Sequence, residues 1–430
     1  MGRYSICPPG PAPAGTREHH MPTLPSPSPL SRHWALDPDR VFLNHGSFGA
    51  TPRVVQQEQA AWRERLEAEP VSLFVERHAD LMDDARRSLG GFLRCPWSDL
   101  ALLPNASTAV NTVLAGLRLN PGDELLMNDH EYPACQNTLR HYAGRAGASV
   151  VRVSLPFPIG GPDEVVRAYE AGVTPRTRLA LVSHVTSPTG LVFPVARVVK
   201  AMHGRGVDVL VDGAHAPGMV ADLDLSALSP AYYTANCHKW ICSPKGTAFL
   251  YVRPDRQPGL RPLVLSNNAE RPKAGRSHFL TEFDYQGTAD YTGFYSIPGA
   301  IRAMGSILPE GWPGVMRANH ELCVRARAML CEAWGVTPPA PAEMLGSIAT
   351  IILPPHDQAR RARLMQRPTR YHDALQDALL TKWGIQVPVW GLADRPDRFL
   401  RISAQLYNSM EQYEYLARAV REELAAERAL

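Results

Sequence analysis

An aspartate and a lysine are the most informative pair of residues in this chain. Asp212 ends the apolar run V-D-V-L-V-D (207–212), and Lys239 follows 27 residues later within N-C-H-K-W (236–240). A carboxylate can keep a pyridine nitrogen protonated so that the ring accepts electrons, and a lysine amine can hold an aldehyde as a Schiff base. These are the two groups that pyridoxal 5'-phosphate chemistry requires. We therefore predict that Asp212 and Lys239 bind this cofactor.

Each of these residues also has a purely structural interpretation. An acid after a strand can cap the next helix, and a lysine beside Trp240 can extend across the ring toward solvent. Against this, open α/β sheets bind ligands at the carboxyl ends of their strands, and apolar surroundings supply the neutral amine that a Schiff base needs. His215, three residues after Asp212, is expected to contact the ring's phenolic oxygen or the reacting carbon. Otherwise it is a core histidine.

A phosphate group requires backbone amides at the positive end of a helix. The run L-L-P-N-A-S-T-A (102–109) supplies a strand, a turn and a helix start, and it places Ser107 and Thr108 where a phosphate would bind. The same residues suit a simple helix N-cap, and a cap can coincide with an anion site. The loop F-D-Y-Q-G-T-A-D (283–290) has the small, polar character suited to a second phosphate contact.

The pyridine ring needs a flat side chain on the face opposite the lysine. D-H-E-Y-P-A-C (129–135) offers His130 and Tyr132. We favour Tyr132, because its hydroxyl can also act as an acid or base near the substrate carbon. Its alternative role is that of a packed tyrosine before a helix.

Two further segments carry polar groups suited to the cofactor and the substrate. H-V-T-S-P-T-G (184–190) follows a strand and offers Ser187 or Thr186 as a hydrogen-bond donor to the ring oxygen. Arg401, on the expected strand F-L-R-I-S (399–403), is suited to bind a substrate carboxylate through two parallel hydrogen bonds. A structural ion pair is the alternative for this arginine.

Strands and helices alternate over the part of the chain that carries most of these residues. Apolar runs predict strands at 100–103, 124–127, 150–153, 179–182, 207–211 and 248–252. Apolar residues at helical spacing predict helices over 53–69, 78–93, 108–117, 134–143, 162–171 and 195–203. This alternation is typical of an α/β fold with a mainly parallel sheet that helices cover on both faces.

The pattern changes after Ser296. Long helices are predicted over 297–307, 312–334, 371–383 and 411–427, around strands near 347–352 and 398–403. We therefore divide the chain into a Pro-rich, disordered tail (1–33), an N-terminal segment (34–52), a large cofactor-binding domain (53–296) and a smaller α+β C-terminal domain (297–430).

Composition argues against several functional classes. The net charge of +3 is spread along 430 residues without a dense basic block, so a nucleic-acid partner is not expected. No window approaches the roughly 18 uninterrupted apolar residues of a membrane span. The seven cysteines show no C-x-x-C pair or zinc spacing, which favours reduced thiols in a cytoplasmic protein without a structural metal. The first 33 residues lack the apolar region of a signal peptide, and translation can start at Met1 or Met21.

Eight motifs in order resemble one enzyme family. From about Arg40 to the carboxyl end, the chain resembles the class V branch of the fold type I pyridoxal phosphate enzymes. It is most similar to the isopenicillin N epimerase-like group, which also contains hercynylcysteine sulfoxide lyases. The motifs are F-L-N-H-G-S-F-G (42–49), N-A-S-T-A (105–109), D-H-E-Y-P (129–133), H-V-T-S-P-T-G (184–190), V-D-G-A-H-A-P-G (211–218), N-C-H-K-W (236–240), Q-G-T (286–288) and R-I-S-A-Q-L-Y-N (401–408).

The resemblance implies a homodimer whose active sites lie at the subunit interface. In such a dimer, Thr288 reaches the phosphate bound by the neighbouring subunit. The N-terminal motif places Asn44 and His45 at the substrate entrance, and Arg401 holds the α-carboxylate. Two more residues of the N-C-H-K-W motif join the expected cofactor-binding set, namely His238 and Asn236. The latter stands where many relatives carry a phosphate-binding serine.

The resemblance also implies a small-molecule substrate, an amino acid or a derivative of one, and removal of its α-proton by Lys239. Return of a proton to the opposite face by Tyr132 or another acid gives epimerisation, which is the reaction we predict. The alternatives are loss of a β-sulfur group, as in a C–S lyase, and amino transfer. A cysteine desulfurase would need a nucleophilic cysteine shortly before the arginine strand, and the chain has no cysteine after Cys331.

Two other classes of protein would use these residues differently. A metal-dependent hydrolase could employ Asp212, His215 and His238, but it would not need Lys239 or the phosphate loop. A catalytically silent binding module would be expected to have lost Asp212, Lys239 or Arg401, and all three are present.

Overall fold

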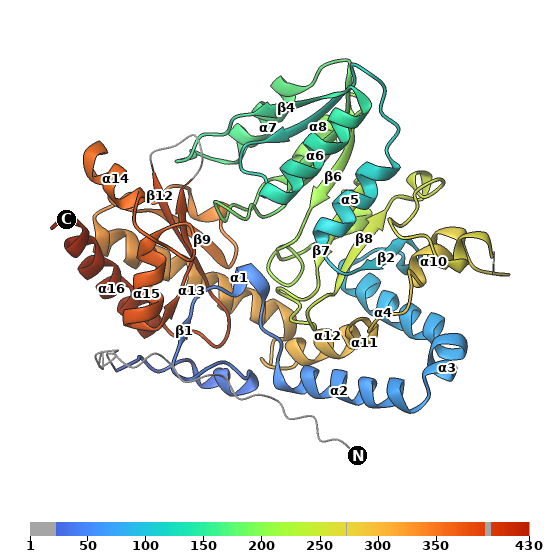
Figure 1. Ribbon diagram of the computed structural model, residues 1–430, viewed down its shortest axis with the longest axis horizontal. Coiled ribbons are helices and arrows are strands. Elements are labelled where there is room, and N and C mark those ends of the chain that lie inside the picture. Colours follow the sequence, from blue (N-terminus) through green and yellow to red (C-terminus); the bar gives the residue numbers. More distant parts are fainter. Residues whose placement is uncertain (1–22, 272, 392–396, 430) are drawn as a thin grey trace.

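A seven-stranded sheet forms the centre of the larger of two structural units (Figure 1). The structure is a computed structural model, and it describes residues 23–271, 273–391 and 397–429. The strand order is β2-β8-β7-β6-β5-β3-β4, and β8 alone runs antiparallel to its neighbours. The mainly parallel α/β sheet that the sequence predicts is confirmed. The strands are β2 (Leu100–Leu103), β3 (Glu124–Asn128), β4 (Ser149–Val153), β5 (Thr177–Ser183), β6 (Asp208–Asp212), β7 (Tyr232–Asn236) and β8 (Ala248–Val252).

Helices cover both faces of this sheet because its strands place apolar side chains on both faces. In β5, Leu179 and Leu181 lie in the core beneath α5 (Ala106–Gly116) and α6 (Pro133–Ala146). Ala180 and Val182 lie in the opposite core. That core is closed by α4 (His78–Leu93), α7 (Pro162–Gly172), α8 (Val195–His203) and α12 (Ile297–Gly305). Burial on both faces is what a parallel sheet requires.

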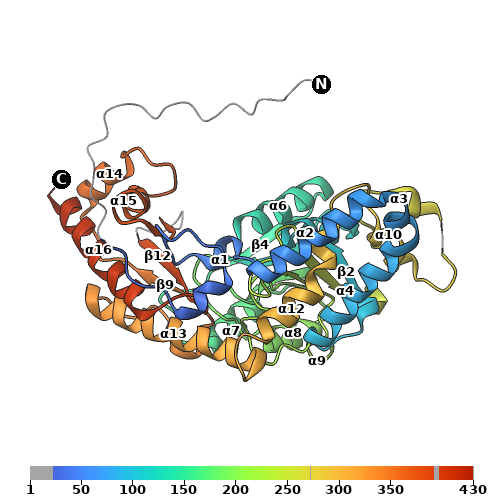
Figure 2. The same cartoon turned by 90° about the horizontal axis from the view of Figure 1, so that it is seen from below.

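The smaller unit is built on a three-stranded antiparallel sheet. Its order is β11 (Val389–Gly391), β12 (Arg398–Ser403) and β9 (Ile348–Ile352). The helices α13 (Gly311–Trp334), α15 (Ala374–Trp383) and α16 (Met410–Arg428) pack around it, and α14 (Gln358–Met365) lies at its outer side (Figures 1 and 2). Helix α12 packs on α4 of the larger unit, so the smaller unit begins with α13. This start lies later in the chain than Ser296, after which the sequence pattern changes.

The N-terminal segment contacts both units. The short strand β1 (Val41–Phe42) pairs with β10 (Ile385–Gln386) of the smaller unit. The single-turn helix α1 (His45–Phe48) follows, and Figure 1 shows it between the two units. The long helix α2 (Arg53–Ala68) then packs on α11 (Thr292–Tyr295) and α12.

Part of the tail that the sequence predicts to be disordered is ordered. Residues 1–22 lie outside the described residues, whereas Pro29–His33 form a 3-10 helix. The amide of Ser28 donates to the carbonyl of Tyr407 at 3.1 Å, and the hydroxyl of Ser409 donates to the carbonyl of Ser26 at 2.7 Å. The prediction is therefore wrong for 23–33, because the extended, proline-rich backbone bonds to the loop before α16. Within the described ranges, no helix has the length and apolar character needed to cross a membrane.

Candidate active site

Three neighbouring parallel strands end at one cavity. Ser183 ends β5, Asp212 ends β6 and Asn236 ends β7, and all three line a cavity of about 330 Å³ together with His215 and Lys239. We call this the lysine cavity. The carboxyl ends of parallel strands meet at the same edge of a sheet, which is why residues distant in sequence converge here.

The amine of Lys239 lies beside a histidine rather than an acid. Its Nζ is 3.2 Å from Nε2 of His215. Desolvation lowers the pKa of Lys239 to about 8, although the charge of Asp212 acts in the opposite direction. A substantial fraction of the amine is therefore neutral near physiological pH, as nucleophilic attack on an aldehyde requires.

The N-terminal segment holds the backbone of Lys239 through a hydrogen bond to its carbonyl oxygen. Nε2 of His45 lies 3.0 Å from the carbonyl oxygen of Lys239, and Nδ1 of His45 lies 2.9 Å from the hydroxyl of Tyr407. His45 is fully buried, and burial lowers its pKa to about 3. The expectation that His45 lines the substrate entrance is therefore wrong: α1 turns this side chain inward, and it positions the lysine segment.

Gly49 allows α1 to approach the lysine segment this closely. Its φ is +69°, and a Cβ there would lie 2.0 Å from the carbonyl oxygen of His238 and 2.9 Å from Cα of Lys239. Both the backbone conformation and the contact exclude a side chain.

Asp212 is buried, and two donors hold its carboxylate. Oδ1 accepts a hydrogen bond from the amide of Ala214 at 3.0 Å, and Oδ2 accepts one from the thiol of Cys135 at 3.3 Å. Burial raises the pKa of Asp212, and both hydrogen bonds oppose this rise. Cys135 was not among the residues expected in the site, because a lone cysteine in the first turn of a helix gives no signal in the sequence.

His215 lies within the cavity wall with one ring nitrogen unused. Nδ1 is buried and has no hydrogen-bond partner within the described residues. Burial, and secondarily the charge of Lys239, lower the pKa of His215 well below its usual value, so the ring is neutral. A buried polar atom without a partner is uncommon in folded proteins and here indicates a missing ligand.

The start of α5 also lines the lysine cavity. Asn105 caps this helix, since its Oδ1 accepts bonds from the amide of Thr108 at 2.8 Å and from its hydroxyl at 3.0 Å. Oδ1 of Asn236 accepts from the amide of Ala106 at 3.0 Å. Of the two residues expected to bind phosphate, Ser107 lines the cavity, whereas the hydroxyl of Thr108 is occupied by the cap.

His238 also lines the lysine cavity. Its Nδ1 is 2.9 Å from the carbonyl of Thr247, and burial lowers its pKa to about 4. The ring is therefore neutral, and because Nδ1 keeps the proton that it donates to this carbonyl, Nε2 can accept a hydrogen bond but cannot donate one to a phosphate.

The structure places only one of the two candidates for stacking on the ring at the lysine cavity. Tyr132 lines it and is 43% exposed. His130 is fully buried outside the lining, with Nδ1 3.1 Å from the hydroxyl of Thr189 and its ring edge-on to Phe157. Of the two candidates, only Tyr132 lines the cavity, and its role stays a prediction.

A second cavity of about 560 Å³ adjoins the first and shares Tyr132 and Ser187 with it. Arg401 of β12 lines this second cavity, which we call the arginine cavity. Arg401 is only 4% exposed, and the central carbon of its guanidinium lies 5.5 Å from the centroid of the Trp390 ring. The two cavities together place a cation next to the lysine.

Neutral groups alone hold the guanidinium of Arg401. Nη1 donates to the carbonyl and hydroxyl oxygens of Ser187 at 2.6 and 3.1 Å. Nη2 donates to Oγ of Ser47 at 2.8 Å and to Oδ1 of Asn44 at 3.3 Å. Nε has no partner in the described part of the chain, and no described carboxylate forms an ion pair with the group. Burial lowers the pKa of Arg401 to about 10, a sign of a cation that lacks an anion.

The hydroxyls expected to bind the ring oxygen have other partners. Ser187 contacts Arg401, although it also lines the lysine cavity. Thr186 is fully buried and bonds to Thr189 and Leu191 within its own turn. Ser187 therefore stays available to both cavities, whereas Thr186 shapes the turn.

Thr288 does not line the lysine cavity of its own chain. It is exposed, and its hydroxyl lies 2.7 Å from that of Tyr285. Its loop begins directly after α10 (His278–Asp284). The exposed position agrees with the expectation that Thr288 acts on a neighbouring subunit, and that expectation stays a prediction.

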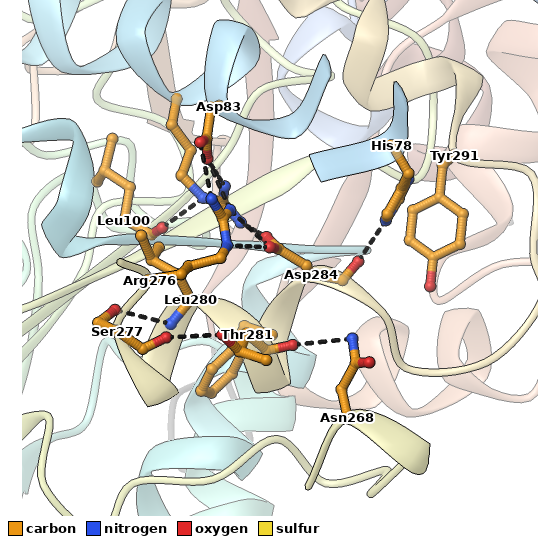
Figure 3. Close-up of polar contacts among 12 residues, drawn as sticks. His78, Asp83, Leu100, Asn268, Arg276, Ser277, Leu280, Thr281, Asp284 and Tyr291 are labelled. Atoms are coloured by element: carbon orange, nitrogen blue, oxygen red, sulfur yellow. Dashed lines mark hydrogen bonds and ion pairs between the residues drawn. The ribbon is translucent and has the colours of Figure 1, made fainter. Parts of the chain in front are cut away.

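A buried charge cluster fixes the start of this loop (Figure 3). Asp284 accepts a hydrogen bond from Nε of Arg276 at 2.8 Å, and Nη1 of Arg276 donates to Asp83 of α4 at 2.8 Å. Arg86 lies between the same two acids. Nε2 of His78 is 2.8 Å from the carbonyl oxygen of Asp284. The loop that carries Thr288 is thus attached to α4 by ion pairs with little access to water.

These residues fit pyridoxal phosphate. The cavity offers an amine with a lowered pKa, an anchored carboxylate, an unpartnered histidine nitrogen and a helix N-terminus. By contrast, no group of three or more His, Cys, Asp or Glu is arranged to hold a metal ion anywhere in the described ranges. The arrangement gives the metal-dependent hydrolase no support.

Comparison with known sequences agrees with this site. The family model for aminotransferase class-V matches residues 41–416. An isopenicillin N epimerase of Amycolatopsis lactamdurans is 34% identical over 90% of this chain and 96% of its own length. A probable chloroplastic L-cysteine desulfhydrase of Arabidopsis thaliana is 30% identical over 91% of this chain and 84% of its own length.

Solved structures share the fold. The C-DES protein, solved with glycine covalently linked to its pyridoxal phosphate cofactor, superposes with a TM-score of 0.72 at 22% identity and covers 88% of this chain and 96% of its own. A cysteine desulfurase of Thermococcus onnurineus gives a TM-score of 0.74 at 17% identity, with 95% of this chain and 100% of its own covered. The predicted fold type I architecture is confirmed.

Proposed function

The chain belongs to the class V aminotransferase family of pyridoxal phosphate-dependent enzymes, and on that basis we propose that it epimerises the α-carbon of an amino-acid-derived substrate. The observation that supports this reaction is the presence of two groups suited to proton transfer, Lys239 and Tyr132, in the wall of one cavity. Epimerisation needs a base that removes the α-proton and an acid that returns one to the other face.

When bound, the cofactor supplies an aldehyde for the substrate amine and a ring that accepts electrons from the α-carbon. Asp212 would face the ring nitrogen, and His215 would offer its unpartnered Nδ1 to a ring substituent. Ser107 and the amides of α5 would hold the phosphate. With the cofactor bound, the amine of Lys239 would take the α-proton, and the hydroxyl of Tyr132 would return a proton to the α-carbon.

The substrate carboxylate would bind Arg401. This guanidinium is buried and unpaired with any described acid, and its Nε–H is free to donate to a carboxylate. A second, parallel hydrogen bond from Nη2 would replace its bond to Ser47 or Asn44. The arginine cavity extends beyond this guanidinium, toward Trp390 and Arg140. Its volume of about 560 Å³ favours a substrate with a side chain longer than that of cysteine.

A C–S lyase of the hercynylcysteine sulfoxide lyase type is the second candidate. The similarity to proteins named L-cysteine desulfhydrases over about nine-tenths of the chain supports it. Removal of the α-proton by Lys239 is common to both reactions. In the lyase, the sulfur group leaves from the β-carbon, and Tyr132 would protonate it.

Incubation of the holoenzyme with a panel of amino acids in heavy water distinguishes these reactions. Mass spectrometry and chiral chromatography would detect deuterium at the α-carbon with inverted configuration if the enzyme is an epimerase. Pyruvate and a released sulfur compound would identify the lyase and overturn our first proposal. A new keto acid with aminated cofactor would identify amino transfer. No exchange with any bulky or small amino acid would contradict all three.

We further propose that the enzyme is a cytoplasmic homodimer with shared active sites. The exposed position of Thr288, outside the lysine cavity of its own chain, supports the sharing of sites. The six described cysteines are free thiols, which agrees with a reducing compartment.

A further inference from the structure

A buried thiol contacts the carboxylate expected to face the ring nitrogen. Cys135 lies in the first turn of α6, is 1% exposed and donates a hydrogen bond to Oδ2 of Asp212 at 3.3 Å. The donor and acceptor belong to different elements, since α6 follows β3 while Asp212 ends β6. The contact is therefore a product of the tertiary fold rather than of local chain geometry.

Among the six described cysteines, Cys135 alone lines the lysine cavity. The others lie in apolar cores or beside other segments, as do Cys237 in the core under α4 and Cys323 in the core of the smaller unit. The same cavity contains Nδ1 of His215, which is buried and unpartnered. The thiol thus lies in the wall of a cavity that has an unpartnered polar atom available to a ligand.

Asp212 needs support from such a donor. Oδ1 is anchored by the amide of Ala214, and that single bond leaves the carboxylate free to rotate about it. The thiol anchors Oδ2 and fixes the plane of the group. The cation that favours the charged carboxylate is Lys239, and its amine must give up its proton to attach to an aldehyde. A hydrogen bond from a thiol does not depend on that proton.

We propose that Cys135 is a positioning residue, whose thiol keeps the Asp212 carboxylate ionised and fixed in orientation for the ring nitrogen of the cofactor. It touches neither the reacting carbon nor the substrate amine in this assignment, and it acts through Asp212 alone. The inference rests on the cofactor and not on the choice between epimerase and lyase.

The affinity of the apoprotein for pyridoxal phosphate tests this assignment. Cys135→Ala removes the donor without adding bulk. We expect it to weaken cofactor binding about 10-fold, as measured by quenching of tryptophan fluorescence, since a hydrogen bond to a charged group is lost. The absorbance band of the bound cofactor should also shift, because a less firmly ionised Asp212 holds the ring nitrogen proton more weakly.

A double-mutant cycle separates action through Asp212 from simple packing. In an Asp212→Ala background, the further change Cys135→Ala should alter cofactor affinity by less than about 2-fold. Cys323→Ala, which removes an equally buried thiol from the smaller unit, should leave affinity and absorbance unchanged. An equal loss of affinity in both backgrounds would assign Cys135 to packing and overturn the proposal, as would an unaltered affinity and absorbance band in Cys135→Ala itself.

Discussion

Nζ of Lys239 lies 3.2 Å from Nε2 of His215, within a cavity whose acid, Asp212, bonds to other donors. A lysine beside a carboxylate would keep its proton, because an ion pair stabilises the charged form. A neutral imidazole provides no such charge. The pairing of amine with imidazole therefore leaves the lysine ready to act as a nucleophile and as a base.

Lys239→Ala should abolish covalent attachment of the cofactor. The wild-type protein treated with borohydride should gain the mass of reduced pyridoxal phosphate on this lysine, as detected by peptide mass spectrometry. Lys245, six residues further on and exposed, serves as the control, and Lys245→Ala should retain the adduct. A covalent adduct that persists in Lys239→Ala would refute the assignment.

Attachment of the cofactor should depend on pH with a midpoint near 8. Desolvation lowers the pKa of Lys239 to about 8, so the nucleophilic amine is largely neutral above that pH and largely protonated below it. The rate at which apoprotein forms the covalent adduct should rise about 10-fold per pH unit below 8 and level off above it. Stopped-flow absorbance between pH 6 and 10 would measure this. A midpoint near the ordinary lysine value of 10.5 would contradict the environment described here.

Asp212→Ala should retain weak cofactor binding and lose turnover. Without a carboxylate, the ring nitrogen loses its proton and the ring accepts electrons poorly, so the α-proton exchange rate should fall on the order of 10²-fold or more. Proton NMR of amino acids in heavy water would follow the exchange. Undiminished exchange would rule out the proposed role of Asp212.

Arg401→Ala should raise KM for carboxylate-bearing substrates by about 10²-fold, which corresponds to one charged, hydrogen-bonded pair of roughly 3 kcal/mol. Arg398 on the same strand is the matched control, because it is paired with Asp373 and Glu427 away from the cavities. Arg398→Ala should lower thermal stability and leave KM unchanged. An unchanged KM in Arg401→Ala would show that the carboxylate binds elsewhere.

Thr288 should act across the dimer interface. In a mixture of Lys239→Ala and Thr288→Asp proteins, a heterodimer contains one site with both native residues if Thr288 serves the partner's cofactor. Refolding equal amounts together should then restore about one quarter of the wild-type activity by random pairing. If Thr288 serves its own chain, no native site forms and the mixture stays as inactive as its components.

The sequence predicts the parts of the fold that depend on local pattern. The boundaries of α4, α8 and β12 agree with the predicted ranges, because each has a clear apolar period and clear end signals. Strand β7 was not predicted, although Asn236 at its end lines the cavity. Its residues Y-Y-T-A-N alternate too briefly to stand out, and the neighbouring strands β6 and β8 decide its conformation.

The site was predicted where a motif fixes a residue's position and missed where only tertiary contacts do. Asp212, His215 and Lys239 line one cavity, since each lies at or soon after the end of a strand, and their roles stay predictions. His45 was placed wrongly because the direction of its side chain depends on how α1 packs against Tyr407. Cys135 was missed because nothing in its neighbourhood along the chain indicates a partner 77 residues away.

A single short segment, α1 and the residue before it, carries both the groups that hold Arg401 and the group that holds Lys239. Asn44 and Ser47 bond to the guanidinium, while His45 bonds to the lysine carbonyl. In every α-amino acid the carboxylate carbon is bonded directly to the α-carbon. The geometry of this segment can therefore stay the same whatever side chain the substrate carries. With the roles proposed for Arg401 and Lys239, substitutions in the wall around Trp390 are expected to change the substrate without disturbing the proton chemistry.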